Sequence, residues 1–385
     1  MKNEASLSKF LIETEKAAQE IVGFEYEHED EDSVDEKPYN PDDIRITQKF
    51  FSVSDVCRWM SSNPPTITIK PEFQRNFVWS ERKKSLLIES LMLRIPVPSF
   101  YLYEDSDEHK SVIDGLQRLS TIHDYVSGEF VLCNLQYLGD SCNGKKFSEL
   151  DQKYRTRIED TQLNINILDA NSPEQVKFDV FTRINTGGVP LNRQEIRNAL
   201  ANTSTMKLMK RMATSESFLL ATHGVVKDVR MDAQELCIRF IAFFNAYDPR
   251  EKILMKNKTI SNMLDTCIQH LNTCNQQTLD EYFTSFEASM RKAAAALGKM
   301  AFIKPTERII INKPLFTSWA VTLAYSDYSI SCLEENQNKL MNKYKELLFS
   351  DSEYFNSIST STGTKKNIDI QFASVLRVLE VLEND

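Results

Sequence analysis

Segments with strand-forming sequence are confined to the first half of the chain, and this restricts the fold more than any other feature. Short apolar runs bounded by turn residues occur between residues 67 and 168, where segments with helical spacing separate them. After residue 200 the apolar residues recur at helical spacing, and little of the sequence is typical of a strand. We therefore predict an α+β protein in which an α/β domain is followed by a mainly α-helical domain. The predicted strands are Ile67–Ile69, Phe100–Tyr103, Ser111–Ile113, Phe130–Leu132 and Leu163–Leu168.

Capping residues, prolines and apolar spacing define the predicted helices. Ser54 is expected to cap a helix that runs to about Ser62, and Ser80 to cap one over Glu81–Leu93. Further helices of the first half are predicted near Gln117–Val126, Ser148–Glu159, Pro173–Ile184 and Asn192–Asn202. Those of the second half are Met206–Met212, Asp232–Ala246, Ile260–Leu271, Leu279–Leu297, Leu315–Tyr325, Leu333–Phe349 and Ile368–Leu382.

Charge is distributed unevenly along the 385 residues. Of the net charge of -9, residues 1–43 carry -10, from 14 acidic and 4 basic side chains, whereas the remaining 41 acids and 42 bases nearly balance. We expect an acidic, partly disordered arm over residues 1–43, an α/β domain over residues 44–202 and a helical domain over residues 203–385. The acidity of the whole chain therefore does not exclude a nucleotide or nucleic-acid partner.

The cysteine and apolar patterns favour a soluble intracellular protein. The 7 cysteines are odd in number and form no C-x-x-C pair, which favours reduced thiols. The N-terminal sequence MKNEASLSKF lacks the basic and apolar regions of a signal peptide. No apolar run approaches the roughly 18 residues that suggest a membrane span. We therefore expect a cytoplasmic protein.

The segment Pro71–Trp79, with the sequence P-E-F-Q-R-N-F-V-W, is the first candidate for a binding role. Its aromatic residues and valine can hold a turn against the protein interior, so that Arg75 directs a permanently charged, forked group into a cleft. The alternative is a solvated arginine beside ordinary core aromatic residues. Composition alone does not separate these two interpretations.

The segment Val112–Thr121, with the sequence V-I-D-G-L-Q-R-L-S-T, is the second candidate. A short apolar strand ends in Asp114-Gly115 and leads directly into a helix, whose first amides can form an anion site. Gly115 allows the backbone to approach a ligand closely, and Gln117 and Arg118 add donors suited to phosphate oxygens. Asp114 can hold a divalent cation or orient water. The alternative is an aspartate N-cap with a helical arginine in an ion pair.

The third candidate runs from Phe181 to Asn198 and contains the turn Thr186-Gly187-Gly188 between two predicted helices. Arg183, Asn185 and the glycine backbone can contact a phosphate or another polar ligand, and Asn192 is a competent N-cap for the second helix. Glu195 and Arg197 would then support the site. The alternative is that the glycines only end a helix and that these two charges are solvated.

Together and in this order, the blocks resemble the N-terminal domain of GmrSD-type, modification-dependent restriction endonucleases. The blocks are F-Q-R-x-F-V-W, I-P-V-P-S-F, V-I-D-G-L-Q-R-L-S-T-I and F-T-R-I-N-T-G-G-V-P-L-N-x-Q-E-I-R-N-A, and they cover about residues 45–200. The resemblance implies a ParB/sulfiredoxin-like α/β fold. It also implies nucleotide binding and hydrolysis that control DNA cleavage, commonly in bacterial defence against phage.

The resemblance also implies roles for individual residues. Leu116 stands where the family motif D-G-Q-Q-R has its first glutamine, so no role that requires that amide is expected here. The catalytic residues carried over are Asp114, Gln117 and Arg118, with Asp114 also as the metal ligand. The nucleotide-binding residues carried over are Gln74, Arg75, Gly115, Arg183, Asn185 and Gly187. The expected cofactor is a nucleoside triphosphate with a divalent cation, Mg²⁺ in the first instance.

Relatives often carry a C-terminal nuclease domain of the H-N-H type, with clustered histidines. Here His223 and His270 are the only histidines of the second half, and they are far apart in sequence.

We therefore expect a nucleotide hydrolase that acts on DNA or with a separately encoded nuclease. Two alternatives stay open. One is a module that binds DNA or a modified base without turnover, using Arg82, Lys83 and Lys84, which are equally typical of a solvated helix face. The other is a nuclease that uses a divalent metal at Asp114.

Overall fold

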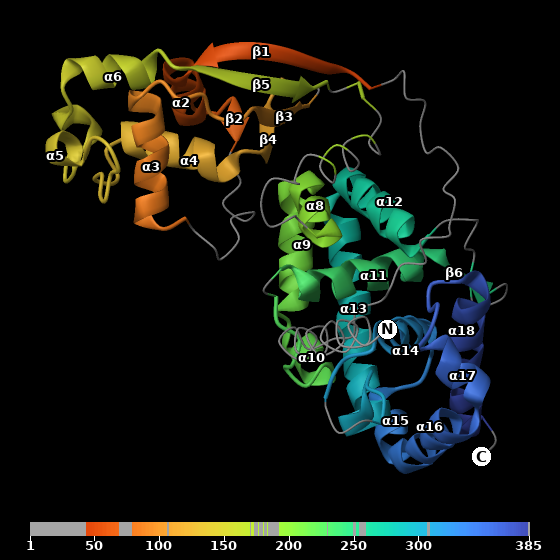
Figure 1. Cartoon of the computed structure of the whole chain (residues 1–385). Helices are drawn as coiled ribbons and strands as arrows, with labels where there is room; N and C mark the ends of the chain where they lie inside the picture. The colour runs from red at the N-terminus through yellow and green to blue at the C-terminus, as the bar shows by residue number, and fades with distance from the viewer. Residues whose placement is uncertain are drawn as a thin grey trace, which may run out of the picture. The chain divides into compact units, whose positions relative to one another are not determined.

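The computed structural model describes residues 44–68, 79–105, 108–169, 171–172, 176, 180, 183, 192–228, 230–248, 252–253, 259–305 and 309–383. The described residues fall into two compact units, one within residues 36–199 and the other within residues 200–385. The first contains a mixed sheet with helices, and the second is almost entirely helical (Figure 1). The expected α+β class is thereby confirmed. The predicted acidic arm, residues 1–43, lies outside the described residues.

The sheet has 5 strands in the order β1-β5-β3-β4-β2. β1 pairs with β5 and β3 with β4 in antiparallel fashion, whereas β3 runs parallel to β5 and β2 parallel to β4. As a result, β1 and β4 both end at the edge of the sheet where β3 and β5 begin. The strands are β1 (Ile46–Ser52), β2 (Ile67–Thr68), β3 (Phe100–Glu104), β4 (Lys110–Asp114) and β5 (Gln162–Leu168).

The core of this unit lies between one face of the sheet and its helices. Leu163, Ile165 and Ile167 of β5 point to this face and are buried with side chains from all four longer helices. Those helices are α2 (Val53–Ser61), α3 (Glu81–Met92), α4 (Leu116–Val126) and α6 (Gln152–Glu159). Two shorter elements follow α4, namely α5 (Gly139–Cys142) and a 3-10 helix at Phe147–Glu149.

The structure of this unit departs from the sequence-based expectations at three places. β1 was not expected, because residues 46–50 are exposed on both faces and lack the alternation of a half-buried strand. Phe130–Leu132 forms no strand, although Leu132 accepts a hydrogen bond from the amide of Gly144 at 2.7 Å. The N-cap of α2 is Ser52, not Ser54, because the Ser52 hydroxyl accepts from the amide of Asp55.

A buried carboxylate fixes the loop that precedes α5. Glu89 of α3 is 3% exposed, and its oxygens accept hydrogen bonds from the backbone amides of Gln136, Tyr137 and Leu138 at 3.0, 2.7 and 2.8 Å. A charge buried to this extent is tolerated because it is fully hydrogen-bonded. Glu89 therefore determines the path of a loop almost fifty residues further along the chain.

The helical unit is built around α14 (Lys313–Tyr325), in which every residue from Lys313 to Leu323 is buried. A helix that is apolar on all sides belongs at the centre of a domain, and α14 packs against α11, α13 and α18. The other helices are α9 (Thr203–Ala213), α10 (Glu216–Ala221), α11 (Asp232–Ala246), α12 (Ile260–Thr273), α13 (Gln276–Leu297), α15 (Ile330–Glu335), α16 (Gln337–Ser350), α17 (Ser352–Ser357) and α18 (Lys365–Leu379). None of the described helices is long and apolar enough to cross a membrane.

The helical unit departs from the sequence-based expectation mainly in its short elements. The helix expected over Leu333–Phe349 is two helices, α15 and α16, which meet at Asn336. The short helices α10 and α17 were not expected, nor were the two-residue strands β6 (Tyr247–Asp248) and β7 (Lys252–Ile253). Elements this short contain too few residues for a periodic pattern to be visible.

Replacing Glu89 tests its role in holding the loop. In Glu89→Ala three backbone amides lose their charged acceptor, so we expect the free energy of unfolding to fall by about 3 kcal/mol. The matched control is Glu81→Ala on the same helix, because the Glu81 side chain is 60% exposed and its ion pair with Lys84 is superficial. Urea unfolding of the full chain, with hydrogen exchange of peptides from residues 44–168, measures both. Equal stability of the two variants would contradict the assignment.

Candidate functional site

The candidate site lies where β4 passes into α4 (Leu116–Val126). Asp114 is the last residue of β4 and is paired with Tyr101 of β3, beside a register irregularity between Tyr101 and Leu102. The next residue, Gly115, is the N-cap of α4 and has a φ of 95°, in the left-handed region. The alternative in which Asp114 caps the helix is therefore wrong, because Gly115 occupies the cap position.

Gly115 is required here for both its conformation and its size. A Cβ added at Gly115 would lie 2.3 Å from Cδ1 of Phe100, which is fully buried. Glycine also has no side chain to cap the helix, and α4 shows no side-chain capping bond, unlike α2 and α3. The amides of the first turn are therefore left to water or a ligand.

Arg118 joins three parts of the chain at this point. Its Nη2 donates to Oδ2 of Asp114 at 2.8 Å and to the carbonyl oxygen of Ser99 at 3.2 Å. Its Nη1 donates to the carbonyl oxygen of Pro98. The guanidinium carbon also lies 4.5 Å from the ring centroid of Phe100. The ion pair between Asp114 and a helical arginine, which was the alternative to a binding site, is thus present. Arg118 also holds the segment that precedes β3.

The electrostatics of the pair depend on its partial burial. The Arg118 and Asp114 side chains are 14% and 30% exposed. Burial lowers the pKa of the Arg118 guanidinium, and the adjacent carboxylate of Asp114 opposes this shift. An arginine stays charged throughout, so the site combines a fixed cation with a carboxylate that still reaches solvent.

The donor set fits a metal held chiefly by its substrate. Among the described residues no group of three or more histidine, cysteine, aspartate and glutamate side chains is arranged to hold a metal ion. Mg²⁺ commonly binds through one or two carboxylates, waters and substrate phosphates. Asp114 suits that role, and it does not suit a site made of protein ligands alone.

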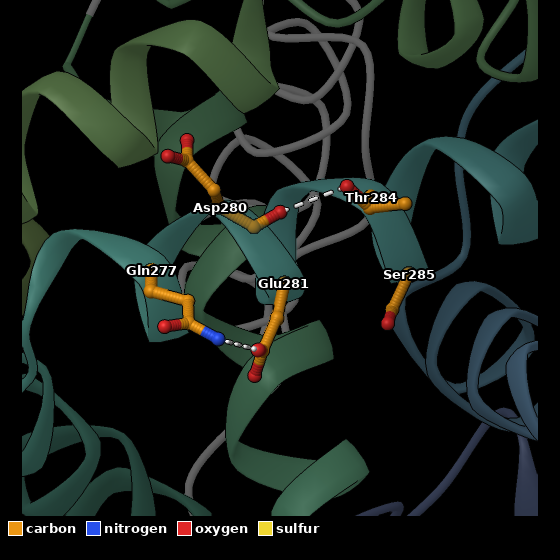
Figure 2. A pocket seen from close by; sticks show the side chains of 5 residues that line it. All are labelled: Gln277, Asp280, Glu281, Thr284 and Ser285. Carbon is orange, nitrogen blue, oxygen red and sulfur yellow. Dashed lines mark hydrogen bonds between the residues drawn. The ribbon is translucent and has the colours of Figure 1, made fainter.

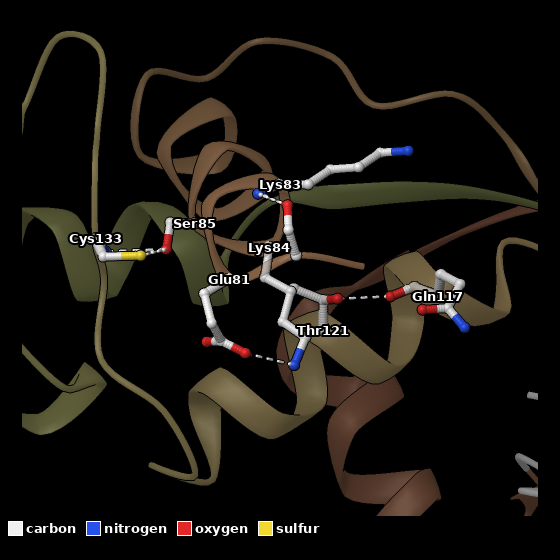
Figure 3. Close-up of polar contacts among 8 residues, drawn as sticks. Glu81, Lys83, Lys84, Ser85, Gln117, Thr121 and Cys133 are labelled. Atoms are coloured by element: carbon white, nitrogen blue, oxygen red, sulfur yellow. Dashed lines mark hydrogen bonds and ion pairs between the residues drawn. The ribbon is translucent and has the colours of Figure 1, made fainter. Parts of the chain in front are cut away.

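The first turn of α3 places further polar groups close to α4. α3 packs against α4, and Figure 3 shows Gln117 and Thr121 of α4 with residues of α3. The Gln117 side chain is half-buried, and the main-chain carbonyl oxygen of Gln117 accepts from the Thr121 hydroxyl at 2.7 Å. Lys84 is paired with Glu81 at 3.2 Å, whereas Lys83 is exposed and its Nζ lies 4.4 Å from the ring centroid of Trp79.

The structure brings four of the predicted site residues together, namely Asp114, Gly115, Gln117 and Arg118, which are consecutive in the motif apart from Leu116. Arg183 is helical and exposed. The remaining predicted residues, Gln74, Arg75, Asn185 and Gly187, lie outside the described residues, as does the turn Thr186-Gly187-Gly188.

The start of α8 (Arg193–Leu200) corrects one interpretation of the third block. Asn192 and Glu195 form a reciprocal cap, in which each side-chain oxygen accepts from the other residue's amide at 2.7 Å. Glu195 and Arg197 are 5% and 3% exposed, so the alternative that treats them as solvated charges is wrong. Arg197 donates to Gln194 at 3.5 Å. These residues are internal, and they support the fold of the block.

Sequence reasoning missed the polar residues beside Arg118. The carbonyl oxygen of Ser99 accepts a hydrogen bond from Arg118. The Ser99 hydroxyl accepts a second one, from Nδ2 of Asn164 at 2.8 Å. The available signal was the alternation L-N-I-N-I in the predicted strand Leu163–Leu168. Amides at alternate positions lie on the face of the sheet opposite the core, and they are unusual there in a short strand.

A surface hollow on α13 is unsuited to phosphate. Gln277, Asp280, Glu281, Thr284 and Ser285 line it, all from one helix (Figure 2). Gln277 donates to Glu281 at 3.2 Å, and Asp280 is paired with Arg211 at 2.7 Å. Two carboxylates and no cation among the described lining residues would repel an anion.

Comparison with known families supports the resemblance that the sequence blocks of the sheet-containing unit suggest. Residues 60–202 match the model of the GmrSD restriction endonuclease, N-terminal domain. The match includes β4, Gly115 and α4, and it confirms the resemblance drawn from the sequence blocks. No curated protein and no solved structure matches the chain.

The GmrSD N-terminal domain match begins inside α2 and ends within two residues of the end of α8. β1 precedes the matched segment, and the helical unit from α9 onward follows it. The helical unit therefore lies outside the match, and the ParB/sulfiredoxin likeness of the sheet stays an expectation.

Gly115→Ala tests whether the geometry at the start of α4 is as tightly constrained as it looks. The matched control is Gly128→Ala just after the other end of α4, because Gly128 has a φ of 79° but nothing within 4 Å of an added Cβ. Both substitutions strain the backbone by about 1 kcal/mol, and only Gly115→Ala also collides with Phe100. We expect Gly115→Ala to be about 1–3 kcal/mol less stable than the control in urea unfolding. Equal stabilities of the two variants would show that the Phe100 side chain can move aside without cost, which would contradict the assignment.

Proposed function

We propose that the GmrSD-like domain binds and hydrolyses a nucleoside triphosphate at the N-terminus of α4, as part of a system that restricts foreign DNA. The family match supports the restriction and defence role. The observation that carries the nucleotide proposal is the uncapped start of α4 at Gly115, held beside the Asp114–Arg118 pair. These features together favour a multiply charged anion.

Each group at this position has a role in the proposed site. The first-turn amides after Gly115 receive phosphate oxygens, and Gln117 adds a side-chain donor from the same turn. Arg118 supplies positive charge from a fixed position, since it is already bound to two carbonyl oxygens. The oxygen of Asp114 that does not accept from Arg118 is left to bind Mg²⁺ or the attacking water.

The proposed reaction is attack of water on the γ-phosphorus. A bond forms between the water oxygen and phosphorus, and the bond from phosphorus to the β,γ-bridging oxygen breaks, giving a nucleoside diphosphate and inorganic phosphate. One proton of the water is released during attack. Bound Mg²⁺ would supply charge neutralisation of the phosphates. The protein contributes position and charge, which account for most of the catalysis in such reactions.

Two observations suggest a partner for the proposed hydrolase, namely the restriction endonuclease family that the domain matches and the helical unit that follows the domain. The hydrolysing domain precedes a helical unit centred on α14. We propose that this helical unit signals to DNA, or to a separately encoded nuclease, whether the domain has bound a triphosphate or its hydrolysis product.

Gln117→Ala tests the function, because the half-buried Gln117 side chain can be removed with little effect on folding. We expect the full-length protein to hydrolyse at least one nucleoside triphosphate in the presence of Mg²⁺. Gln117→Ala should lower kcat/KM by about tenfold, the loss expected for one phosphate hydrogen bond to a charged group. Asp114→Asn should lower it further and change its dependence on Mg²⁺ concentration. Phosphate release over a panel of four triphosphates, with and without DNA, measures these effects.

The matched control is Gln152→Ala, which removes a glutamine from the first turn of α6. Its activity should equal that of the parent. A parent protein without turnover, whose nucleotide binding is unchanged in Gln117→Ala and Asp114→Asn, would overturn the proposal.

DNA binding without turnover is the second candidate function. The exposed side chains of Arg82 and Lys83 at the start of α3 favour it, whereas Lys84 is engaged with Glu81. In the same panel, salt-dependent DNA binding with no phosphate release, unaffected by Asp114→Asn, would support this candidate in place of the first.

A further inference from the structure

A row of side chains crosses the end of the sheet next to the Asp114–Arg118 pair. β1 ends and β5 begins at this edge, and Phe50 of β1 is paired directly with Asn164 of β5. The amide of Asn164 contacts Ser99, just before β3, and Ser99 contacts Arg118. We call these residues, with Gln48, the sheet-end row. Two strand spacings, roughly 10 Å, separate Phe50 from Ser99.

Phe50 presents an aromatic ring to solvent. Its side chain is 63% exposed, whereas the next residue, Phe51, packs against the core and against Trp59. Successive side chains of a strand point to opposite faces, so Phe50 lies on the face of the sheet away from the helices. An exposed phenylalanine beside polar side chains provides a flat apolar surface, and such surfaces stack with nucleobases.

The polar members of the row form a continuous chain of hydrogen bonds. Nε2 of Gln48 donates to Oδ1 of Asn164 at 2.8 Å, and Nδ2 of Asn164 donates to Oγ of Ser99 at 2.8 Å. Arg118 then donates to the carbonyl oxygen of Ser99 at 3.2 Å. The amides are thereby held in fixed orientations, and each keeps capacity for another bond.

This arrangement matches the needs of a nucleobase. Recognition of a base combines stacking on an aromatic ring with hydrogen bonds to its polar edge, and the planar amides of asparagine and glutamine are common readers of that edge. The phosphate-binding features lie at the opposite end of the row, at Gly115 and Arg118. The sugar and phosphates of one nucleotide can span the distance between the two ends.

We propose that the sheet-end row is the base-recognition part of the nucleotide site, in which Phe50 stacks on the base and Gln48 and Asn164 read its edge. The Ser99 hydroxyl lies between the base and phosphate ends, where the sugar would pass. This inference rests on the proposed function, since it assigns the base of the same nucleotide whose phosphates bind at α4. Phe50 and Gln48 both precede the segment that matches the family model.

Comparing a nucleotide with inorganic tripolyphosphate separates base recognition from phosphate binding. With Mg²⁺ present, Phe50→Ala should weaken binding of the preferred nucleoside triphosphate by about tenfold or more, the loss typical of one stacked base. Its affinity for tripolyphosphate should stay within about twofold, because the phosphate end is intact. Asn164→Asp should change the order of preference among the four triphosphates, since it replaces a donor with an acceptor. Isothermal titration calorimetry on the full-length variants measures these affinities.

Two controls define the outcome. Ile46→Ala removes an apolar side chain, 44% exposed, from the other end of the same strand and should bind both ligands as the parent does. Gln117→Ala should weaken binding of both ligands. Unchanged nucleotide binding in Phe50→Ala, or equal weakening toward tripolyphosphate, would overturn the base assignment while leaving the phosphate site in place. A parent protein that binds neither ligand would overturn the proposed function as well, which is a distinct result.

Discussion

The structure at the sheet end depends on one interaction, the ion pair between Arg118 and Asp114. From a single turn of α4, the guanidinium reaches the end of β4 through Asp114 and the segment before β3 through Pro98 and Ser99. It also covers the ring of Phe100, and this ring leaves room only for glycine at position 115. The conformation of Gly115, the start of α4 and the partly exposed carboxylate of Asp114 are therefore fixed together.

At the proposed phosphate site such an arginine would act from a fixed position, since its guanidinium is held by the carbonyl oxygens of Pro98 and Ser99. The proposed site would therefore be pre-formed, with its positive charge in place before a nucleotide binds. The same contacts extend through Ser99 to Asn164 and then to Gln48 on β1. Hydrogen bonds thus connect the proposed base end of the site with its proposed phosphate end.

The sequence predicted the parts of this unit whose patterns are local and strong. Leu163–Leu168 alternates clearly between core and amide residues, and Asp114-Gly115 marks a strand-to-helix turn. β1 was missed because residues 46–50 are exposed on both faces of the strand. The contact of Glu89 with a loop 47 to 49 residues away leaves no trace in either segment. The pairing of Phe50 with Asn164 likewise depends on strand order and register, which no local pattern encodes.

A crystal structure of the full chain with Mg²⁺ and a non-hydrolysable triphosphate would test the central claim most directly. We predict phosphate oxygens on the first-turn amides of α4, Mg²⁺ between them and Asp114, and Arg118 still bound to the carbonyl oxygen of Ser99. The base should lie against Phe50. A nucleotide bound elsewhere on the chain, with the start of α4 in contact only with water, would contradict the account.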